Sequence, residues 1–187
     1  SEAMELAGRI IDTNAKKSNK RSKFIVLKDS FHGRTSNAAL FSNSGSELYK
    51  SKLKSYGYHN MTETVEINNE NDFQVRVLNV LLDDYNIDAV IMEPVQGEGN
   101  PGIQLSRDFY RCVREVTNKL KIPLVIDSVQ AGIRTNGCLS IVDYPQMEGL
   151  DAPDMEIFSK AISSGHYPLS VLAMQDHIAD MYEIGTY

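Results

Sequence analysis

The chain has 187 residues, 42% of them hydrophobic and 24% charged, with a formal net charge of −6. These values predict an ordinary globular protein that forms one domain or most of a larger one. The negative charge offers no general attraction to nucleic acid or anionic lipid, and no apolar run reaches the ~18–20 residues that cross a bilayer, so we expect neither nucleic-acid nor membrane partners. Only Cys112 and Cys138 occur, without metal-type spacing, which fits a reducing compartment.

The first predicted element is a helix over residues 1–11, where apolar residues share one helical stripe and Ser1 stands at the cap position. Polar, basic residues at 15–23 predict a loop. The β-branched run at 24–28 predicts a strand, and small polar residues at 29–45 predict a second loop. The N-terminal quarter therefore reads as helix, strand and a long polar loop.

Further along the chain, strand-like apolar runs alternate with amphipathic helical patterns. The predicted elements are a strand over 62–68, a helix from about Asn71 to Tyr85, a strand over 89–94, a helix over 109–120 capped near Ser106, strands over 122–127, 155–159 and 168–174, and a final helix around Ile178, Met181 and Tyr182. Strands that are apolar on both faces predict an α/β three-layer sandwich with a mainly parallel mixed sheet covered on both sides.

Polar residues follow four of the predicted strands. In parallel sheets, ligands gather at the carboxyl ends of the strands, so these residues are the candidates for a site. They are the loop residues 31–35, the acids Glu93 and Glu98, the pair Asp127 and Gln130, and Lys160. The topology predicts that they converge at one edge of the sheet.

Lys160 is the cation that needs explaining, because an ammonium at a buried strand end is costly unless it is paired, neutral or chemically used. A neutral lysine forms a Schiff base with an aldehyde such as pyridoxal phosphate. That cofactor also needs a carboxylate at its pyridine nitrogen and a phosphate site. Asp127 is a candidate for the first, and the helix N-terminus at Ser1 for the second. Taken alone, an Asp that closes an apolar strand is more often a cap or a turn former, and a lone Lys after a strand is mostly a solvated strand end.

Five motifs in chain order strengthen the cofactor interpretation: SEAMELA, FHGRTSNA, MEPVQGEGNPG, DSVQAGIRTNG and SKAISSGHYPLS. Together they resemble the motifs of the class III, fold type I pyridoxal-phosphate aminotransferases, most of all the ornithine aminotransferase branch. The resemblance spans essentially the whole chain. It implies the cofactor-binding large domain of a fold type I enzyme.

The resemblance assigns roles to the candidate residues. It implies that Lys160 is the catalytic lysine that forms the internal aldimine and then moves a proton as general acid and base. Asp127 is expected to pair with the pyridine N–H, Gln130 to donate to the 3-oxygen of the cofactor, and Phe31 to stack on its ring. Ser1 is expected to hold the phosphate.

Other residues receive less specific roles. Glu98 resembles the family carboxylate that pairs with a substrate-binding arginine, and Glu93 resembles a second acid lining the substrate site, although both could simply be solvated. Arg134 is expected to brace the loop after Asp127. His32 is counted with the cofactor-binding residues, while packing is the alternative for both His32 and His166.

Two positions depart from the family pattern, and the length departs too. Ser128 stands where the family usually has Glu, and Ser164 stands where it tends to have no side chain. Family members are roughly twice as long. Residues 1–187 are therefore expected to be a partial large domain, without an N-terminal segment, the end of the large domain and a C-terminal small domain.

The expected function is transfer of an amino group from an amino acid, of a basic type such as ornithine, lysine or acetylornithine, to a 2-oxo acid. Decarboxylase, aminomutase or epimerase chemistry on the same fold is the first alternative, and a non-catalytic fragment or dimerisation module is the second. A homodimer is expected by resemblance, in the cytoplasm or the mitochondrial matrix.

Overall fold

The computed structural model describes residues 1–15, 20–54, 56 and 60–182. Within them, a central sheet has the strand order β2-β1-β3-β4-β5-β6. The strands are β1 (Arg21–Leu27), β2 (Thr62–Val65), β3 (Tyr85–Met92), β4 (Leu124–Asp127), β5 (Met155–Phe158) and β6 (Val171–Met174). The first five run parallel and β6 runs antiparallel to β5. The predicted mainly parallel mixed sheet is confirmed.

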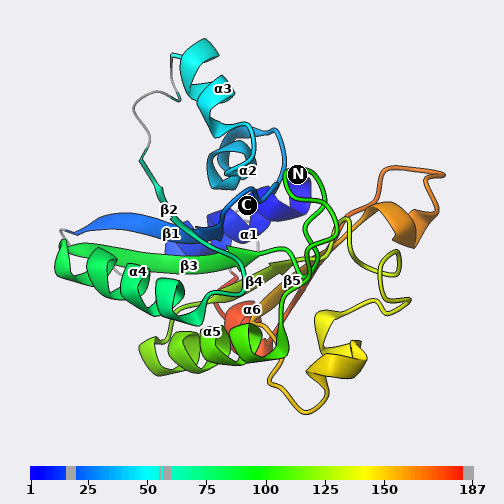
Figure 1. Cartoon of the computed structure of the whole chain (residues 1–187). Helices are drawn as coiled ribbons and strands as arrows, with labels where there is room; N and C mark the ends of the chain where they lie inside the picture. Colours follow the sequence, from blue (N-terminus) through cyan, green and yellow to red (C-terminus); the bar gives the residue numbers. More distant parts are fainter. Residues whose placement is uncertain (16–19, 55, 57–59, 183–187) are drawn as a thin grey trace.

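Helices cover both faces of the sheet (Figure 1). They are α1 (Glu2–Asn14), α2 (Ser36–Phe41), α3 (Ser46–Lys52), α4 (Glu70–Leu82), α5 (Arg107–Leu120) and α6 (Asp176–Ala179). In β1, Ile25 and Leu27 pack in the cluster with α4 and α5, whereas Phe24 and Val26 pack in the cluster with α1. This alternation follows from the two-residue period of a strand and produces the three-layer arrangement.

Two predicted boundaries were wrong around β1 and β3. Residues 21–23 belong to β1 instead of the predicted loop, and residues 16–19 of that loop lie outside the described residues. Tyr85, predicted to end a helix, begins β3. The helix ends at Leu82 because Asp84 adopts a left-handed backbone conformation, with φ of 65°, that turns the chain into the strand.

The predicted loop at 29–45 contains α2, and α3 begins directly after it. Ala38, Ala39 and Phe41 are buried, and the Phe41 ring lies against Gly8 of α1. These helices are too short for a clear helical period, so tertiary packing decides their conformation. At the other end of the chain, the final helix stops at Ala179.

The edge strands differ from the expected pattern. The residues of β6 alternate between exposed and half-buried, and only the last residue of β2 is buried. The expectation that every strand is apolar on both faces is therefore wrong at both edges of the sheet. None of the helices in the described ranges has the length and hydropathy of a bilayer-crossing segment.

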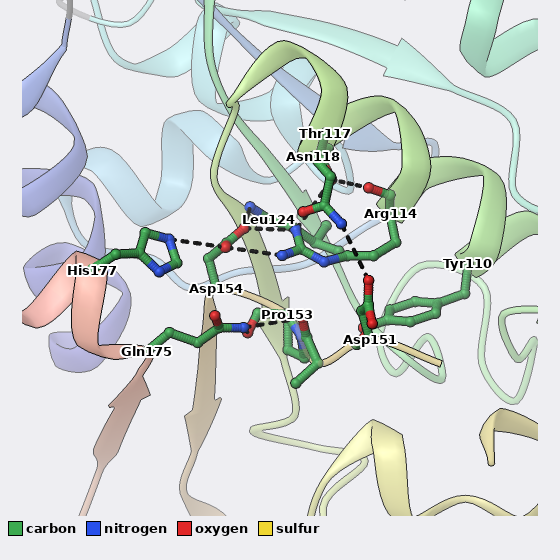
Figure 2. Close-up of polar contacts among 11 residues, drawn as sticks. Tyr110, Arg114, Thr117, Asn118, Leu124, Asp151, Pro153, Asp154, Gln175 and His177 are labelled. Atoms are coloured by element: carbon green, nitrogen blue, oxygen red, sulfur yellow. Dashed lines mark hydrogen bonds and ion pairs between the residues drawn. The ribbon is translucent and has the colours of Figure 1, made fainter. Parts of the chain in front are cut away.

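A buried ion pair joins α5, β4, β5 and α6 at the amino ends of the strands (Figure 2). Arg114 donates from both terminal nitrogens to Asp154, at 2.8 and 3.0 Å. Asp154 also accepts from the Leu124 N–H at 2.7 Å and lies 3.1 Å from Nε2 of His177. The Asp154 carboxylate thus links α6 to the sheet, at the opposite ends of the strands from the predicted site.

Candidate active site

A cavity of about 240 Å³ opens at the carboxyl ends of the parallel strands. The candidate residues that line it are Ser1, Phe31, His32, Glu93, Asp127, Gln130 and Lys160. They come from the start of α1 and from the segments after β1, β3, β4 and β5, as the topology predicts. Glu98 and His166 are not among the lining residues. One site therefore gathers every predicted cofactor-binding residue.

Asp127 ends β4 and is only 5% exposed. Its Oδ2 lies 2.9 Å from Nδ1 of His32, and its Oδ1 accepts the N–H of Val129 at 3.1 Å. A buried carboxylate needs such partners, since it has lost its water. The two contacts fix the orientation of a carboxylate that lines the cavity.

The His32 side chain is completely buried. Its backbone N–H donates to Ser42 Oγ at 2.8 Å, while its Nε2 has no partner among the described residues. With Asp127 ionised, Nδ1 must carry the proton, so in the neutral ring Nε2 is a bare acceptor. That tautomer accommodates the orphaned atom better than a cationic ring, which would leave an N–H donor unpaired.

Glu93 follows β3 directly and is 2% exposed. Its two oxygens accept the backbone N–H groups of Phe31 at 2.9 Å and Gly97 at 3.1 Å. Burial raises the pKa of Glu93 to about 7, although the two backbone N–H groups oppose the rise. Because both oxygens are engaged by backbone, this geometry favours a bracing role for Glu93 over direct contact with substrate.

Glu98 and Gln130 form a contact at the rim of the cavity. Gln130 Nε2 donates to Glu98 Oε1 at 2.9 Å, and Glu98 is exposed. The amide of Gln130 lies so close to Gly97 that a Cβ there would overlap it. The residue that lines the cavity is therefore Gln130, and Glu98 reaches the site through it.

Lys160 is exposed, so the expectation of a buried ammonium was wrong. The reason is that β5 ends at Phe158 and a 3₁₀ turn, Lys160–Ser163, projects beyond the sheet. Enough protein still surrounds the amine to lower its pKa, chiefly by desolvation, with Glu98 opposing. Lys160 also adopts a left-handed backbone, with φ of 46°, which is uncommon for a residue other than glycine and occurs often at functional sites.

Ser1 stands at the N-cap of α1 but does not cap the helix through its side chain. Its Oγ instead accepts the N–H of Arg34 at 3.3 Å. The helix N-terminus favours anions, whereas Glu2 and Glu5 in its first turn weaken that attraction.

Arg34 lies in the candidate loop 31–35, but the sequence pattern assigned it no role of its own. It lines the cavity and its guanidinium lies 5.8 Å from the centre of the Phe31 ring. Beside Ser1, it adds a cation that could hold a phosphate by charge and hydrogen bonding. An arginine that closely follows a predicted aromatic is the sequence signal that could have assigned it this role.

A larger cavity of about 340 Å³ lies at the opposite edge of the sheet, between α1, α5 and α6. It is lined mainly by apolar side chains, with the buried acid Asp88 and Lys121 as its titratable groups and no histidine among its lining residues. Titratable groups of several kinds are needed for acid–base chemistry. The smaller cavity is therefore the candidate active site.

Several named proteins are similar in sequence to this chain over part of their own length. The chain is 33% identical over 159 residues to the mitochondrial ornithine aminotransferase of Drosophila melanogaster, covering 84% of this chain and 33% of that protein. It is 33% identical to the [LysW]-aminoadipate semialdehyde/glutamate semialdehyde transaminase of Sulfurisphaera tokodaii, over 100% of this chain and 43% of that protein. The chain thus spans less than half the length of these relatives.

Solved structures share the fold. A transaminase from the marine bacterium Virgibacillus superposes with a TM-score of 0.78 at 26% identity, over 95% of this chain and 40% of that chain. The ornithine aminotransferase of Toxoplasma gondii gives a TM-score of 0.78 at 24% identity, over 100% of this chain and 42% of that chain. The family model for class III aminotransferases matches residues 1–187. The chain therefore belongs to the class III aminotransferase family.

Proposed function

We propose that these residues form part of the large domain of a pyridoxal-phosphate-dependent aminotransferase. The observation that carries the proposal is the convergence of Phe31, Asp127, Gln130 and Lys160 on one cavity. The proposed donor is a basic amino acid such as ornithine, lysine or acetylornithine, and the proposed acceptor is a 2-oxo acid. Similarity to relatives named as ornithine aminotransferases supports this choice of donor.

The residues present fit pyridoxal phosphate. Asp127 is a buried carboxylate oriented by His32 and suits a protonated pyridine nitrogen, because opposite charges offset the cost of burial. Arg34 and the start of α1 suit the phosphate, and Phe31 offers a half-buried aromatic face. When bound, the cofactor supplies an electron sink for the bonds at the amine-bearing carbon of the substrate.

The chain's own residues would then handle binding and protons. Lys160 would carry a proton to and from the substrate carbon through Nζ, and its lowered pKa favours the neutral amine that can accept one. Asp127 would supply the negative charge that pairs with the pyridine nitrogen of the cofactor. Gln130 would donate a hydrogen bond into the site, with Glu98 holding its amide.

We also propose a homodimer in the cytoplasm or the mitochondrial matrix, on the basis of family resemblance. The homodimer and the compartment are proposed for the whole protein and depend on the proposed aminotransferase function.

The test is to add pyridoxal phosphate to the protein, record the visible absorbance, reduce with borohydride and map the labelled peptide. The expected result is a stable band with the label on Lys160, lost in Lys160→Arg, which keeps the charge but removes the reactive amine. Labels scattered over surface lysines would contradict the proposal. A donor screen for 2-oxo-acid-dependent turnover then separates transamination from decarboxylation or racemisation.

A further inference from the structure

An enclosed cluster of hydroxyl and carboxylate groups lies beside the candidate site and surrounds Glu156 of β5. Glu156 is 5% exposed. Its Oε1 accepts the Ser128 hydroxyl at 2.5 Å and the Ile141 N–H at 3.1 Å, while its Oε2 accepts the Ser140 hydroxyl at 2.5 Å. These donors are neutral, so hydrogen bonds, not a countercharge, stabilise this carboxylate.

The side chain of Glu156 lies on the face of the sheet away from the cavity. Glu156 pairs in register with Ile126, which packs in the cluster with α4 and α5. Its neighbour Ile157 pairs with Asp127 and lines the cavity. Since successive side chains of a strand point to opposite faces, Glu156 cannot contact a ligand in the cavity directly.

What Glu156 does contact are the two ends of one loop. Ser128 follows Asp127 at the start of the loop, and Ser140 with Ile141 ends it. The loop carries Gln130, which lines the cavity. On the other side, β5 leads from Glu156 to Lys160. One carboxylate therefore connects the segment that carries Gln130 to the strand that leads to Lys160.

We propose that Glu156 is a positioning residue for the cofactor site, which closes the loop 128–141 onto β5 and so holds Asp127 and Gln130 in place relative to Lys160. This inference rests on the proposed function. This buried acceptor is costly to remove, because the buried Ser128 hydroxyl and Ile141 N–H would lose their hydrogen bonds without regaining water. Burial raises the pKa of Glu156, and the hydrogen bonds from the Ser128 and Ser140 hydroxyls oppose the rise, as expected for a buried carboxylate that accepts hydrogen bonds.

Three variants test the proposal. Glu156→Val leaves the two hydroxyls and the Ile141 N–H unpaired. Glu156→Gln keeps one oxygen for Ser128 and Ile141, and its amide can donate to the Ser140 hydroxyl, which can turn to accept. The double variant Ser128→Glu/Glu156→Val returns a carboxylate to the same contact from the other strand.

Two readouts are measured: the dissociation constant of pyridoxal phosphate from the visible band, and hydrogen exchange of the Ile141 amide without cofactor. For Glu156→Val we expect about tenfold weaker cofactor binding and faster Ile141 exchange. Glu156→Gln should stay within about twofold of the unchanged protein, and the double variant should recover most of the lost affinity. Val113→Ala, in the buried face of α5, controls for a general loss of stability and should leave cofactor affinity unchanged where it is folded.

The outcomes are distinguishable. Cofactor affinity unchanged in Glu156→Val, or lowered equally in Val113→Ala, would overturn the positioning role. Unchanged Ile141 exchange in Glu156→Val would overturn the contact itself. A wild-type protein that forms no band on Lys160 would overturn the proposed function and the cofactor part of this inference together, while the exchange measurement would still report on the loop.

Discussion

Nδ1 of His32 lies 2.9 Å from Oδ2 of Asp127, and the two side chains are buried together although they are 95 positions apart in the chain. His32 comes from the loop after β1 and Asp127 from the end of β4. The contact therefore holds the loop with Phe31 against the strand end that supplies the carboxylate. Nε2 of the imidazole has no partner among the described residues, so the contact with Asp127 is the one hydrogen bond that the ring makes there.

His32→Phe tests this contact. Phenylalanine fills the space but cannot donate to Asp127, so we expect about tenfold or more weaker pyridoxal-phosphate binding and a loss of about 1–3 kcal/mol in the free energy of unfolding. His32→Asn is the matched control, since its amide can replace Nδ1 as a donor. Titration of the visible band and thermal unfolding measure both quantities. Equal cofactor affinity in both variants would show that Asp127 does not depend on His32.

Glu93 predicts a pH dependence of stability. Its pKa is raised from 4.5 to about 7 in the folded protein by burial, so the folded state holds a proton that the unfolded state has released between these values. Stability should therefore fall as pH rises from about 5 to 7, by on the order of 2 kcal/mol from this group. Glu93→Gln should remove this contribution, as measured by denaturant unfolding at several pH values.

Glu93→Gln also removes a negative charge, so its comparison with the unchanged protein needs a control variant that loses a charge elsewhere. Glu115→Gln on the exposed side of α5 removes one negative charge far from the cavity. The difference in unfolding free energy between unchanged protein and Glu93→Gln should narrow or reverse between pH 5 and 7. A difference that stays constant over this range would mean that Glu93 titrates in the same way in both states.

The sequence predicted the fold class and the convergence of the site because both depend on pattern. Apolar runs set the strands, and parallel strands bring their carboxyl ends to one edge, which placed Asp127 and Lys160 together before any geometry was known. Their functional roles remain predictions. Short elements were missed because their conformation depends on tertiary packing and not on a sequence pattern. Helix α2, for example, is stabilised by the burial of Phe41 and its neighbours against α1.

Contacts between side chains distant in sequence were also beyond prediction. Glu93 was predicted to bind substrate, but the sequence cannot show that the N–H groups of Phe31 and Gly97 meet its oxygens. The buried acid Glu156 was not singled out, because an acid inside an apolar run has no partner visible in the sequence. Its partners, Ser128 and Ser140, belong to a different segment.

Asp154 should contribute far more to stability than its partner His177. Figure 2 shows Asp154 between Arg114 on one side and His177 on the other. The Arg114 and Asp154 side chains are each 8% exposed, whereas His177 is 54% exposed. Asp154→Ala leaves the buried Arg114 guanidinium without a countercharge and the Leu124 N–H without its acceptor, so we expect a loss of about 3–5 kcal/mol in unfolding free energy.

His177→Ala is the matched comparison for that ion pair. Because the imidazole is exposed, its removal should cost no more than about 1 kcal/mol. Denaturant unfolding of both variants and of the double variant measures the coupling between the two side chains. A loss in His177→Ala as large as that in Asp154→Ala would contradict the assignment of Arg114 as the main partner.

Ser164, where the family tends to have no side chain, has a left-handed backbone with φ of 52°. A side chain in that conformation costs about 1–2 kcal/mol, while glycine adds about 0.5–1 kcal/mol of unfolded-state entropy, so Ser164→Gly should raise the free energy of unfolding by about 0.5–1 kcal/mol. Gly165→Ala, at φ of 77°, should lower it. Thermal unfolding of the two variants measures the signs, and a loss of stability in Ser164→Gly would mean that the serine side chain holds the turn after Lys160.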